Sequence, residues 1–403
     1  MVSALATVRS LLPNRVPSAS TRRVGALNSW VTGTGLRGSF CESMTSNVSA
    51  RMQRMGYPAI FLRLTSLLIL ISMVAATHAA QVLPAADHHA HLQSATAARL
   101  LNEGARLHPD EALQEKEKPY TAKDLISALD AAGVRRAAAL SEAYLLGTRL
   151  VQVPNEAQVV DRENDWTLRQ VRRYPQRLVG FCSVNPIRPY ALAAIKHCDQ
   201  IGLRGGLKLH LAASHFQFEN SEELHQLEDV FREANRLRMP ILIHIHPYDE
   251  KWDGRRDAQI FIDQVLPLAS DVPVQVAHLA GWGGYDRSAD AGFSTFADKC
   301  AARPALCERL YFDISAVIVP PSAANAPKGS DLRFIYENQK GFAEGPERLA
   351  ANLRRIGLKH ILFATDWPIF TQKDYIKLLR TSLPLTPAEI DEIFRNVAPY
   401  FPH

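Results

Sequence analysis

A run of imidazoles near residue 90 is the strongest chemical signal in the sequence. The stretch Asp87-His88-His89-Ala90-His91 follows an apolar segment, which predicts a short strand. Successive side chains of a strand point to opposite faces. We therefore expect Asp87, His89 and His91 on one face and His88 on the other, toward surrounding helices. Two imidazoles on one face at the end of a strand can bind one divalent metal ion.

Further metal-binding or ionisable residues occur downstream, each at the end of an apolar stretch that predicts a strand. They are Lys208, His210, His244, His246, His278, Asp313 and Asp366. A single buried histidine is more often a hydrogen-bonded part of a core than a ligand. Together with the first run, however, these residues predict a metal site, provided that the fold brings the strand ends together.

Eight apolar segments alternate with helical patterns in the region 81–403. The predicted strands cover residues 82–91, 134–140, 178–184, 203–210, 241–246, 272–278, 309–314 and 360–364. This alternation predicts an α/β protein with a single (β/α)8 TIM-barrel domain. A doubly wound open sheet would show the same alternation but would spread the polar strand ends along a line, whereas a barrel gathers them at one mouth.

Local signals mark several helix ends and one long connection. Thr121 and Asp124 predict a capping box, and Gly133 predicts the end of the same helix. Ser221 predicts the N-cap of an amphipathic helix. Residues 320–330 are rich in Pro, Ala and Ser and are longer than an ordinary loop, which predicts a lid over the barrel mouth.

Residues 1–80 have the composition of a leader that contains a signal peptide. Basic residues precede an apolar run at about 64–76, and small residues follow it. The run is shorter than the roughly 20 residues that a membrane span needs. We expect cleavage after Ala79 or Ala80, export to the periplasm and no stable membrane association afterwards. An uncleaved membrane anchor is the alternative.

The charge distribution disfavours a nucleic-acid partner. The formal net charge is +5, but residues 1–80 contain eight Arg and one acidic residue, a charge of +7, so residues 81–403 carry −2. No basic stripe interleaved with aromatic residues occurs in the sequence, so we expect a small-molecule substrate and no nucleic acid. The sequence is compatible with a homo-oligomer.

The sequence has five cysteines, of which Cys41 falls in the leader. Cys300 and Cys307 follow a helical pattern and precede a strand, so they are close enough to form a disulfide in an exported protein. Two buried free thiols are an equally good interpretation.

From Asp87 to the C-terminus the chain resembles the amidohydrolase superfamily, in particular the amidohydrolase-related branch that also contains non-oxidative decarboxylases and hydratases. The matching segments are Asp-x-His-x-His at 87–91, Gly-Leu-Lys-Leu-His at 206–210, Leu-Ile-His at 242–244, Ala-His-Leu-Ala-Gly at 277–281 and Thr-Asp-Trp-Pro at 365–368. The resemblance implies that His89, His91, His244 and Asp366 hold a metal ion. It also implies that His278 binds a second ion or polarises the substrate.

The resemblance leaves the role of Lys208 open. In two-metal relatives a lysine at the end of the fourth strand is carboxylated and bridges the ions, whereas here Lys208 could instead orient the substrate. His210 and His246 lie on the faces of Lys208 and His244, which makes them candidates for substrate contacts. Arg204, Tyr285 and Trp282 are weaker candidates of the same kind. The expected cofactor is one divalent ion, zinc or alternatively manganese, and the number of ions remains open.

These residues predict a metal-dependent hydrolase that acts on a small amide, lactone or ester-type substrate. A divalent ion lowers the pKa of bound water from 15.7 to about 7. Asp366 would take the proton of the water and pass it to the leaving group, and His278 would stabilise the oxyanion. The alternative is metal-dependent decarboxylation of an aromatic or unsaturated acid. A binding protein without catalysis is disfavoured, because Asp366 is intact.

Overall fold

The computed structural model describes residues 81–108, 117–246 and 253–402. The predicted leader and its signal peptide lie outside the described residues. Within these three ranges no helix combines the length and the apolar character needed to cross a lipid bilayer.

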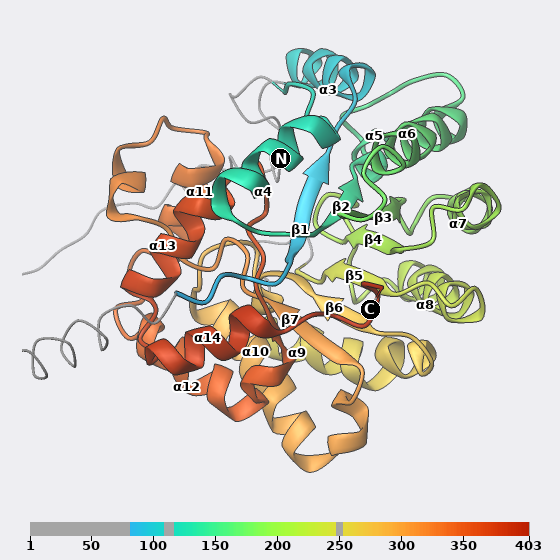
Figure 1. Ribbon diagram of the computed structural model, residues 1–403. Helices are drawn as coiled ribbons and strands as arrows, with labels where there is room; N and C mark the ends of the chain where they lie inside the picture. Colours follow the sequence, from blue (N-terminus) through green and yellow to red (C-terminus); the bar gives the residue numbers. More distant parts are fainter. Residues whose placement is uncertain (1–80, 109–116, 247–252, 403) are drawn as a thin grey trace, which may run out of the picture. The chain divides into compact units, whose positions relative to one another are not determined.

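Eight parallel strands form a barrel surrounded by helices (Figure 1). The strands are β1 (Asp87–Leu92), β2 (Ala137–Ser141), β3 (Leu178–Ser183), β4 (Gly206–His210), β5 (Ile241–His244), β6 (Val274–Val276), β7 (Leu310–Asp313) and β8 (Ile361–Leu362). Each strand pairs with the next one along the chain, from β1 to β8. A doubly wound sheet would require a reversal of strand order, so the predicted (β/α)8 barrel is confirmed and the open sheet is wrong.

The barrel closes between β1 and the chain that leaves β8. His88 N donates to Phe363 O at 3.0 Å, and His91 N donates to Trp367 O at 2.8 Å. These bonds continue the parallel pairing beyond the end of β8. As a result, Asp366 is held beside the histidines of β1.

Asp87 fastens this closure with its side chain. Its buried carboxylate accepts hydrogen bonds from Thr365 N (3.2 Å), Thr365 Oγ1 (2.6 Å) and Gln372 Nε2 (2.8 Å). Burial raises the pKa of Asp87 to about 6, and the hydrogen bonds oppose that shift. We expected Asp87 on the face of His89 and His91, but its carboxylate is bonded to the β8 side and to Gln372.

A β-bulge explains why simple alternation failed at the start of β1. Asp87 pairs with Ala137, and Ala90 pairs with Ala139, so β1 uses one residue more than β2 over this stretch. An extra residue shifts the side chains that follow relative to those before it. The prediction that His88 faces the helices is wrong for the same reason.

His88 instead packs against the C-terminal segment. Its ring lies edge-on to Phe401, with ring centroids 5.3 Å apart, and to Tyr400 at 6.1 Å. Nδ1 lies 2.8 Å from Phe363 O, and Nε2 accepts a hydrogen bond from Ala398 N at 3.1 Å. Phe401 belongs to a buried cluster of inward-facing strand residues and their neighbours: Ala86, Ala138, Leu140, Phe181, Leu242 and Ala277. His88 therefore fixes the C-terminal segment to the barrel.

Helices follow the strands and cover the outside of the barrel (Figure 1). Their bounds are α3 Ala95–Leu107, α4 Ala122–Ala132, α5 Ala143–Leu146, α6 Glu156–Val171, α7 Ala191–Ile201, α8 Ser221–Arg236, α9 Gly254–Ile260, α10 Arg287–Ala302, α11 Asp331–Gln339, α12 Gly345–Ile356, α13 Gln372–Ser382 and α14 Pro387–Arg395. The outward residues of the strands, such as Leu207, Leu209 and Ile243, are fully buried beneath them. Burial of each such side chain stabilises the fold by about 1.5–3 kcal/mol.

The helix caps follow the sequence signals closely. Thr121 and Asp124 form both bonds of the predicted capping box of α4, and Gly133 ends the helix with φ 69°. The cap of α8 is displaced by one residue, since Asn220 rather than Ser221 accepts the amide hydrogens of the first turn.

The long connection after β7 is more ordered than a loop. It contains a 3-10 helix, Pro321–Asn325, and the unpredicted helix α11. Phe334 of α11 contacts Trp282, with ring centroids 5.7 Å apart. The role of this connection as a lid stays a prediction.

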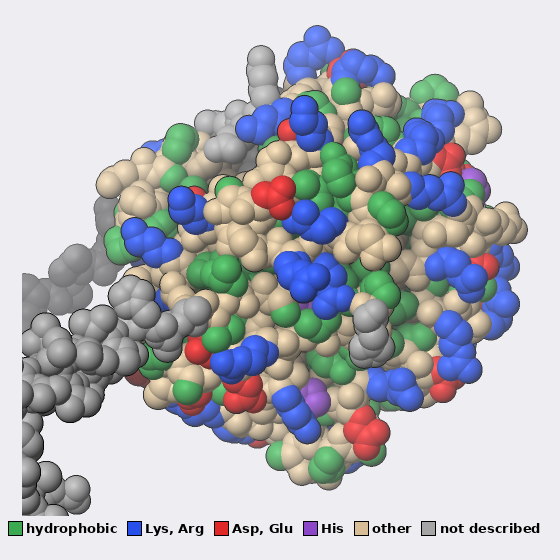
Figure 2. Space-filling view, viewed as in Figure 1, with side chains coloured by type: hydrophobic (Ala, Val, Ile, Leu, Met, Phe, Trp, Pro, Cys, Tyr) green, Lys and Arg blue, Asp and Glu red, His purple; other side chains and the backbone are tan. Residues whose placement is uncertain are grey.

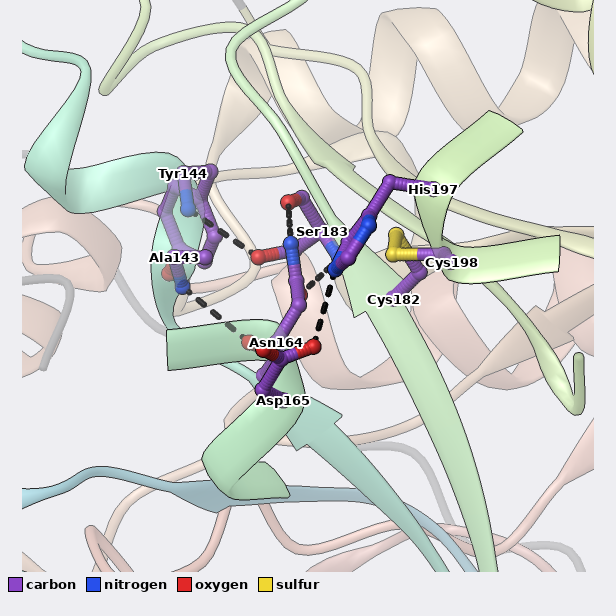
Figure 3. Close-up of a disulfide and its surroundings, with 9 residues drawn as sticks. Ala143, Tyr144, Asn164, Asp165, Cys182, Ser183, His197 and Cys198 are labelled. Atoms are coloured by element: carbon purple, nitrogen blue, oxygen red, sulfur yellow. Dashed lines mark hydrogen bonds and ion pairs between the residues drawn. A yellow bond between two sulfur atoms is a disulfide. The ribbon is translucent and has the colours of Figure 1, made fainter. Parts of the chain in front are cut away.

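Two disulfides join neighbouring elements. Cys300 and Cys307 form a disulfide, with Cα atoms 5.6 Å apart, which agrees with the first of the two interpretations of these cysteines. Cys182 of β3 and Cys198 of α7 form a second pair, with Cα atoms 6.1 Å apart, which the sequence analysis missed (Figure 3). The residues of that pair are 16 positions apart, and only the packing of α7 on β3 brings them together.

Charged side chains are mixed on the face shown in Figure 2. Lys and Arg are spread over this face, with Asp, Glu and hydrophobic side chains between them. Many of the charges form exposed ion pairs, such as Arg232 with Asp229 and Glu228. Exposed pairs of this kind contribute about 0–1 kcal/mol each, so the fold depends on its buried contacts.

Replacement of His88 by Ala should destabilise the protein by about 2–4 kcal/mol, because it leaves a cavity and an unpaired Ala398 N–H. Urea unfolding measures this loss. His225→Ala is the matched control, since the His225 side chain is 73% exposed, and it should change stability little. Equal stability of the two variants would contradict the described role of His88.

The same histidine should make stability depend on pH. Burial lowers the pKa of His88 from its usual 6.5 to about 4. Between these pH values the unfolded chain binds a proton that folded His88 does not, so stability should fall as the pH falls from about 6.5 to about 4. Unfolding curves at pH 7 and pH 5 should show a smaller loss for His88→Ala than for the wild type. An identical loss would show that His88 does not contribute.

Candidate metal centre

The strand ends bring a cluster of buried polar side chains to the barrel mouth. All are at most 2% exposed, and they come from β1, β4, β5, β7 and the segments that follow β6 and β8. The cluster consists of His89, His91, Lys208, His210, His244, His278, Asp313 and Asp366. The closed barrel thus brings the polar strand ends together at one mouth.

Three of these residues present ligand atoms to one point. His89 Nε2 lies 3.1 Å from His91 Nε2, and Asp366 Oδ1 lies 3.3 Å and 3.0 Å from these two atoms. Bonds of about 2.0–2.1 Å to a tetrahedral ion place neighbouring ligands at about this separation. His89, His91 and Asp366 could therefore hold a metal ion.

Two outer carboxylates orient the imidazoles. Asp313 Oδ2 lies 3.1 Å from His89 Nδ1, and Glu142 Oε1 lies 2.8 Å from His91 Nδ1. A proton on each Nδ1 then leaves both Nε2 lone pairs free, which is the arrangement common for metal-binding histidines. Two lone pairs 3.1 Å apart repel each other unless a cation lies between them, so the donor set fits a metal ion.

Asp313 is itself held by several hydrogen bonds. It accepts from Gln275 Nε2 at 2.7 Å, from His278 N at 3.1 Å and from Ser315 Oγ at 2.5 Å. Burial would raise the pKa of Asp313, but His89 and His278 outweigh it and hold the carboxyl well below its usual range. Asp313 was recognised in the sequence only as a strand-end acid, without a role.

Asp366 is ionised, and one of its two carboxylate oxygens has no hydrogen-bond partner among the described residues. Burial would raise its pKa, but His89, His278 and His91 outweigh it and hold the pKa well below its usual range. Its Oδ2 has no hydrogen-bond partner among the described residues and lies 3.9 Å from His278 Nε2. The backbone φ values are 57° at Asp366 and 52° at His278. Such values are unfavourable for residues other than glycine, so both side chains are placed at some cost in backbone energy.

The hydrogen bonds of His278 limit what its ring can do. Nδ1 lies 2.8 Å from Ser315 O, a carbonyl oxygen that can only accept, so Nδ1 carries a proton. A neutral His278 therefore presents Nε2 as an acceptor or ligand atom. It donates to a substrate oxygen, the role expected from the sequence, only when the ring is protonated.

Lys208 reaches the same ligand cluster from β4. It is fully buried, and its Nζ lies 3.1 Å from His89 Nε2. Burial lowers the pKa of Lys208 to about 8, against the opposite effect of Asp366, Asp313 and Glu142. The amine is thus close enough to the cluster for either of the two roles considered for it.

His244 lies farther along the mouth than the three convergent residues. Both of its ring nitrogens lack a hydrogen-bond partner in the part of the chain that the structure describes. Its ring stacks on His210, with centroids 3.9 Å apart, and lies 5.1 Å from His278. Its part in metal binding stays a prediction, as does the substrate contact of His246, which lies 5.1 Å from Trp282.

The rings around the mouth form a continuous arc. Successive ring centroids lie between 3.9 and 5.3 Å apart. The order is Tyr144, His210, His244, His278, His89 and His91. Glu142, whose Oε1 lies 2.8 Å from His91 Nδ1 at one end of the arc, is two positions before Tyr144, at the other end, in the sequence.

Sequence reasoning missed Glu142 and Tyr144. Both follow β2, and polar residues at the carboxyl end of a barrel strand were a usable signal. Of the weaker candidates, Arg204 ion-pairs with Asp199 before β4 begins, and the Tyr285 hydroxyl bonds to Asp290, both of which are ordinary structural contacts. Trp282 does lie beside His244, at 5.8 Å.

Comparisons with known proteins agree with this architecture. The family model described as "Amidohydrolase" matches residues 86–398. No curated protein matches the chain. A crystal structure described as amidohydrolase II is similar with a TM-score of 0.51 and 16% identity over 77% of this chain and 96% of that one.

A second solved structure is 5-carboxyvanillate decarboxylase from Novosphingobium aromaticivorans, complexed with manganese and 4-hydroxy-3-methoxy-5-nitrobenzoic acid. The TM-score is 0.50 and the identity 13%, covering 81% of this chain and 97% of that one. Likeness at such low identity shows a shared fold.

Replacement of the convergent ligands should remove metal. His89→Ala and His91→Ala should each lose most bound metal, and Asp313→Asn should weaken metal binding about 10–100-fold, because Asp313 orients His89. Elemental analysis of the purified proteins measures this. His88→Ala is the control, since its ring faces the C-terminal segment, and it should keep its metal. Normal metal content in His89→Ala would contradict the site as described.

Proposed function

The chain belongs to the amidohydrolase family, and on that premise we propose that it is a metal-dependent hydrolase of a small amide, lactone or ester-type substrate. The observation that carries the proposal is the convergence of His89 Nε2, His91 Nε2 and Asp366 Oδ1 within 3.3 Å of one another. A buried set of two imidazoles and one carboxylate whose ligand atoms converge is typical of a metal site rather than of a packed core.

The ion that we propose is zinc, with manganese as the alternative, because imidazole nitrogen and carboxylate oxygen suit both. His89, His91 and Asp366 would hold it, and His244 is the further ligand on the same mouth. When bound, the ion supplies a Lewis acid that polarises the substrate and lowers the pKa of water. Lys208 would bridge a second ion only if its amine were carboxylated, because an ammonium group has no lone pair for a metal.

Asp366 is the proposed proton carrier. Its carboxylate is ionised, the form that can accept a proton, and its Oδ2 is not engaged by another described residue. Asp366 would accept the proton of the attacking water and return it to the leaving group. His278 Nε2, 3.9 Å from Oδ2, would donate to the substrate oxygen when its ring is protonated.

Decarboxylation is the second candidate function. The observation in its favour is the fold shared with the manganese-containing 5-carboxyvanillate decarboxylase. In this reaction the same ligands would hold an ion that binds the carboxylate and a neighbouring hydroxyl of the substrate. Because Asp366 is ionised, it would first take up a proton from solvent and then deliver it to the carbon that loses carbon dioxide.

We also propose that the enzyme is exported to the periplasm. The supporting observations are the apolar run at 64–76 in the sequence and the two disulfides, which persist in oxidising compartments. N-terminal sequencing of the mature protein tests this. A mature N-terminus near Gln81 is expected, and an intact 64–76 segment in a membrane fraction would contradict it.

A product assay separates the two chemistries. The metal-loaded protein is incubated with a panel of small amides, lactones, esters and aromatic acids, and release of amine, alcohol or carbon dioxide is measured. Hydrolysis predicts amine or alcohol release, which Asp366→Asn should reduce by at least about 10³-fold without loss of the fold. Carbon dioxide release by the wild type but not by Asp366→Asn would replace hydrolysis with decarboxylation.

A further inference from the structure

Two hydrogen-bond donors on the arc of rings have no partner among the described residues. The Tyr144 hydroxyl and His210 Nε2 are shielded from solvent, and neither is bonded to a described residue. Tyr144 is fully buried, and His210 is 2% exposed. Buried polar groups are nearly always paired, so two such atoms in adjacent rings require an explanation.

The hydrogen bonds of His210 define which nitrogen carries its proton. Ala213 N donates to His210 Nδ1 at 3.2 Å, so Nδ1 is an acceptor and the proton of the ring lies on Nε2. A doubly protonated ring could not accept that bond. His210 therefore presents an Nε2–H donor within the mouth.

Tyr144 presents a donor beside it. Burial raises the pKa of Tyr144 well above its usual value, and the negative charge of Glu142 adds to the shift, so the hydroxyl keeps its proton. The Tyr144 ring stacks on the His210 ring, with centroids 5.3 Å apart and planes 25° apart. The two donors thus belong to neighbouring rings of the same wall.

The backbone of Tyr144 is fixed by a network that Figure 3 shows. Tyr144 N donates to Ser183 Oγ at 3.0 Å. The Ser183 backbone is in turn bonded in both directions to the Asn164 side chain of α6, at 3.0 Å each. Because β3 and α6 both hold it, the position of the ring is imposed by the fold.

We propose that Tyr144 O–H and His210 Nε2–H donate hydrogen bonds to a carbonyl or carboxylate oxygen of the substrate. This rests on the proposed function in taking the barrel mouth as the substrate site. A phenylalanine at 144 could occupy the same stack without burying an unpaired hydroxyl. An sp2 oxygen accepts two hydrogen bonds without offering a donor of its own, which matches two donors that have no acceptor.

Tyr144 is then a substrate-binding residue, and His210 binds through Nε2–H in the tautomer that carries its proton there. His210 stacks on His244, which is a proposed metal ligand. The two donors therefore lie next to the proposed metal site. The ion would then hold one end of the substrate. Tyr144 and His210 would hold an oxygen atom of the substrate at its other end.

Three variants test the donor pair. Tyr144→Phe removes only the hydroxyl, and His210→Asn removes Nε2–H while its Oδ1 can still accept from Ala213 N. Tyr285→Phe is the matched control, because its hydroxyl is also buried but is partnered by Asp290 and Asn352. Calorimetry measures the Kd of benzoate, a carboxylate, and benzamide, a neutral carbonyl compound, for metal-loaded and chelator-treated protein.

Tyr144→Phe and His210→Asn should each weaken the binding of at least one probe about 10-fold, and Tyr285→Phe should not. A loss confined to benzoate identifies a carboxylate as the bound group, and a loss for both probes identifies a carbonyl-type oxygen. Tyr144→Phe should also raise the Tm of the ligand-free protein by about 2–4 °C, because it removes an unpaired buried hydroxyl, whereas Tyr285→Phe should lower it.

The proposal is overturned if neither probe binds the wild type, or if Tyr144→Phe and His210→Asn keep the wild-type Kd. It is also overturned if Tyr144→Phe lowers the Tm as Tyr285→Phe does, which would mean that a structural water satisfies the hydroxyl. Metal content is measured alongside. Weakened probe binding in a protein that neither holds metal nor turns over the panel would reject the proposed function and leave this inference standing.

Discussion

Closure of the barrel by the chain that leaves β8 is the constraint on which the rest of the site depends. Asp366 comes 275 positions after His91, yet their ligand atoms lie 3.0 Å apart. Trp367 O accepts from His91 N, and Asp87 bonds to Thr365, so the residues on both sides of Asp366 are anchored to β1. The aspartate that opens the Asp-x-His-x-His motif is thus a fastener of the barrel rather than a ligand.

The site concentrates charge where water is excluded, and this costs stability unless each charge is compensated. Asp313 and Glu142 each contact an imidazole Nδ1, and Lys208 lies within 3.1 Å of His89 Nε2. His91 Nε2 faces His89 Nε2 at 3.1 Å, and Asp366 Oδ2 has no hydrogen-bond partner among the described residues. Those atoms are the ones that a metal ion and a substrate would engage.

Two other buried tyrosines have paired hydroxyls. Tyr285 bonds to Asp290 and Asn352, and Tyr375 bonds to the backbone of Ile314. In contrast to these two tyrosines, Tyr144 has a hydroxyl with no hydrogen-bond partner among the described residues. Natural proteins keep such unfavourable groups mainly at functional sites, where a ligand completes the hydrogen bonds.

By itself the sequence determined the number and order of the strands, the capping box of α4 and the placing of His89, His91 and Asp366 at strand ends. These are local properties, because hydrophobic period and cap residues are set by near neighbours in the chain. Only the tertiary structure decided the orientation of His88 and the stacking of Tyr144 on His210. A bulge depends on the partner strand, and a stacked ring depends on residues distant in sequence. Neither can therefore be predicted from the local sequence pattern.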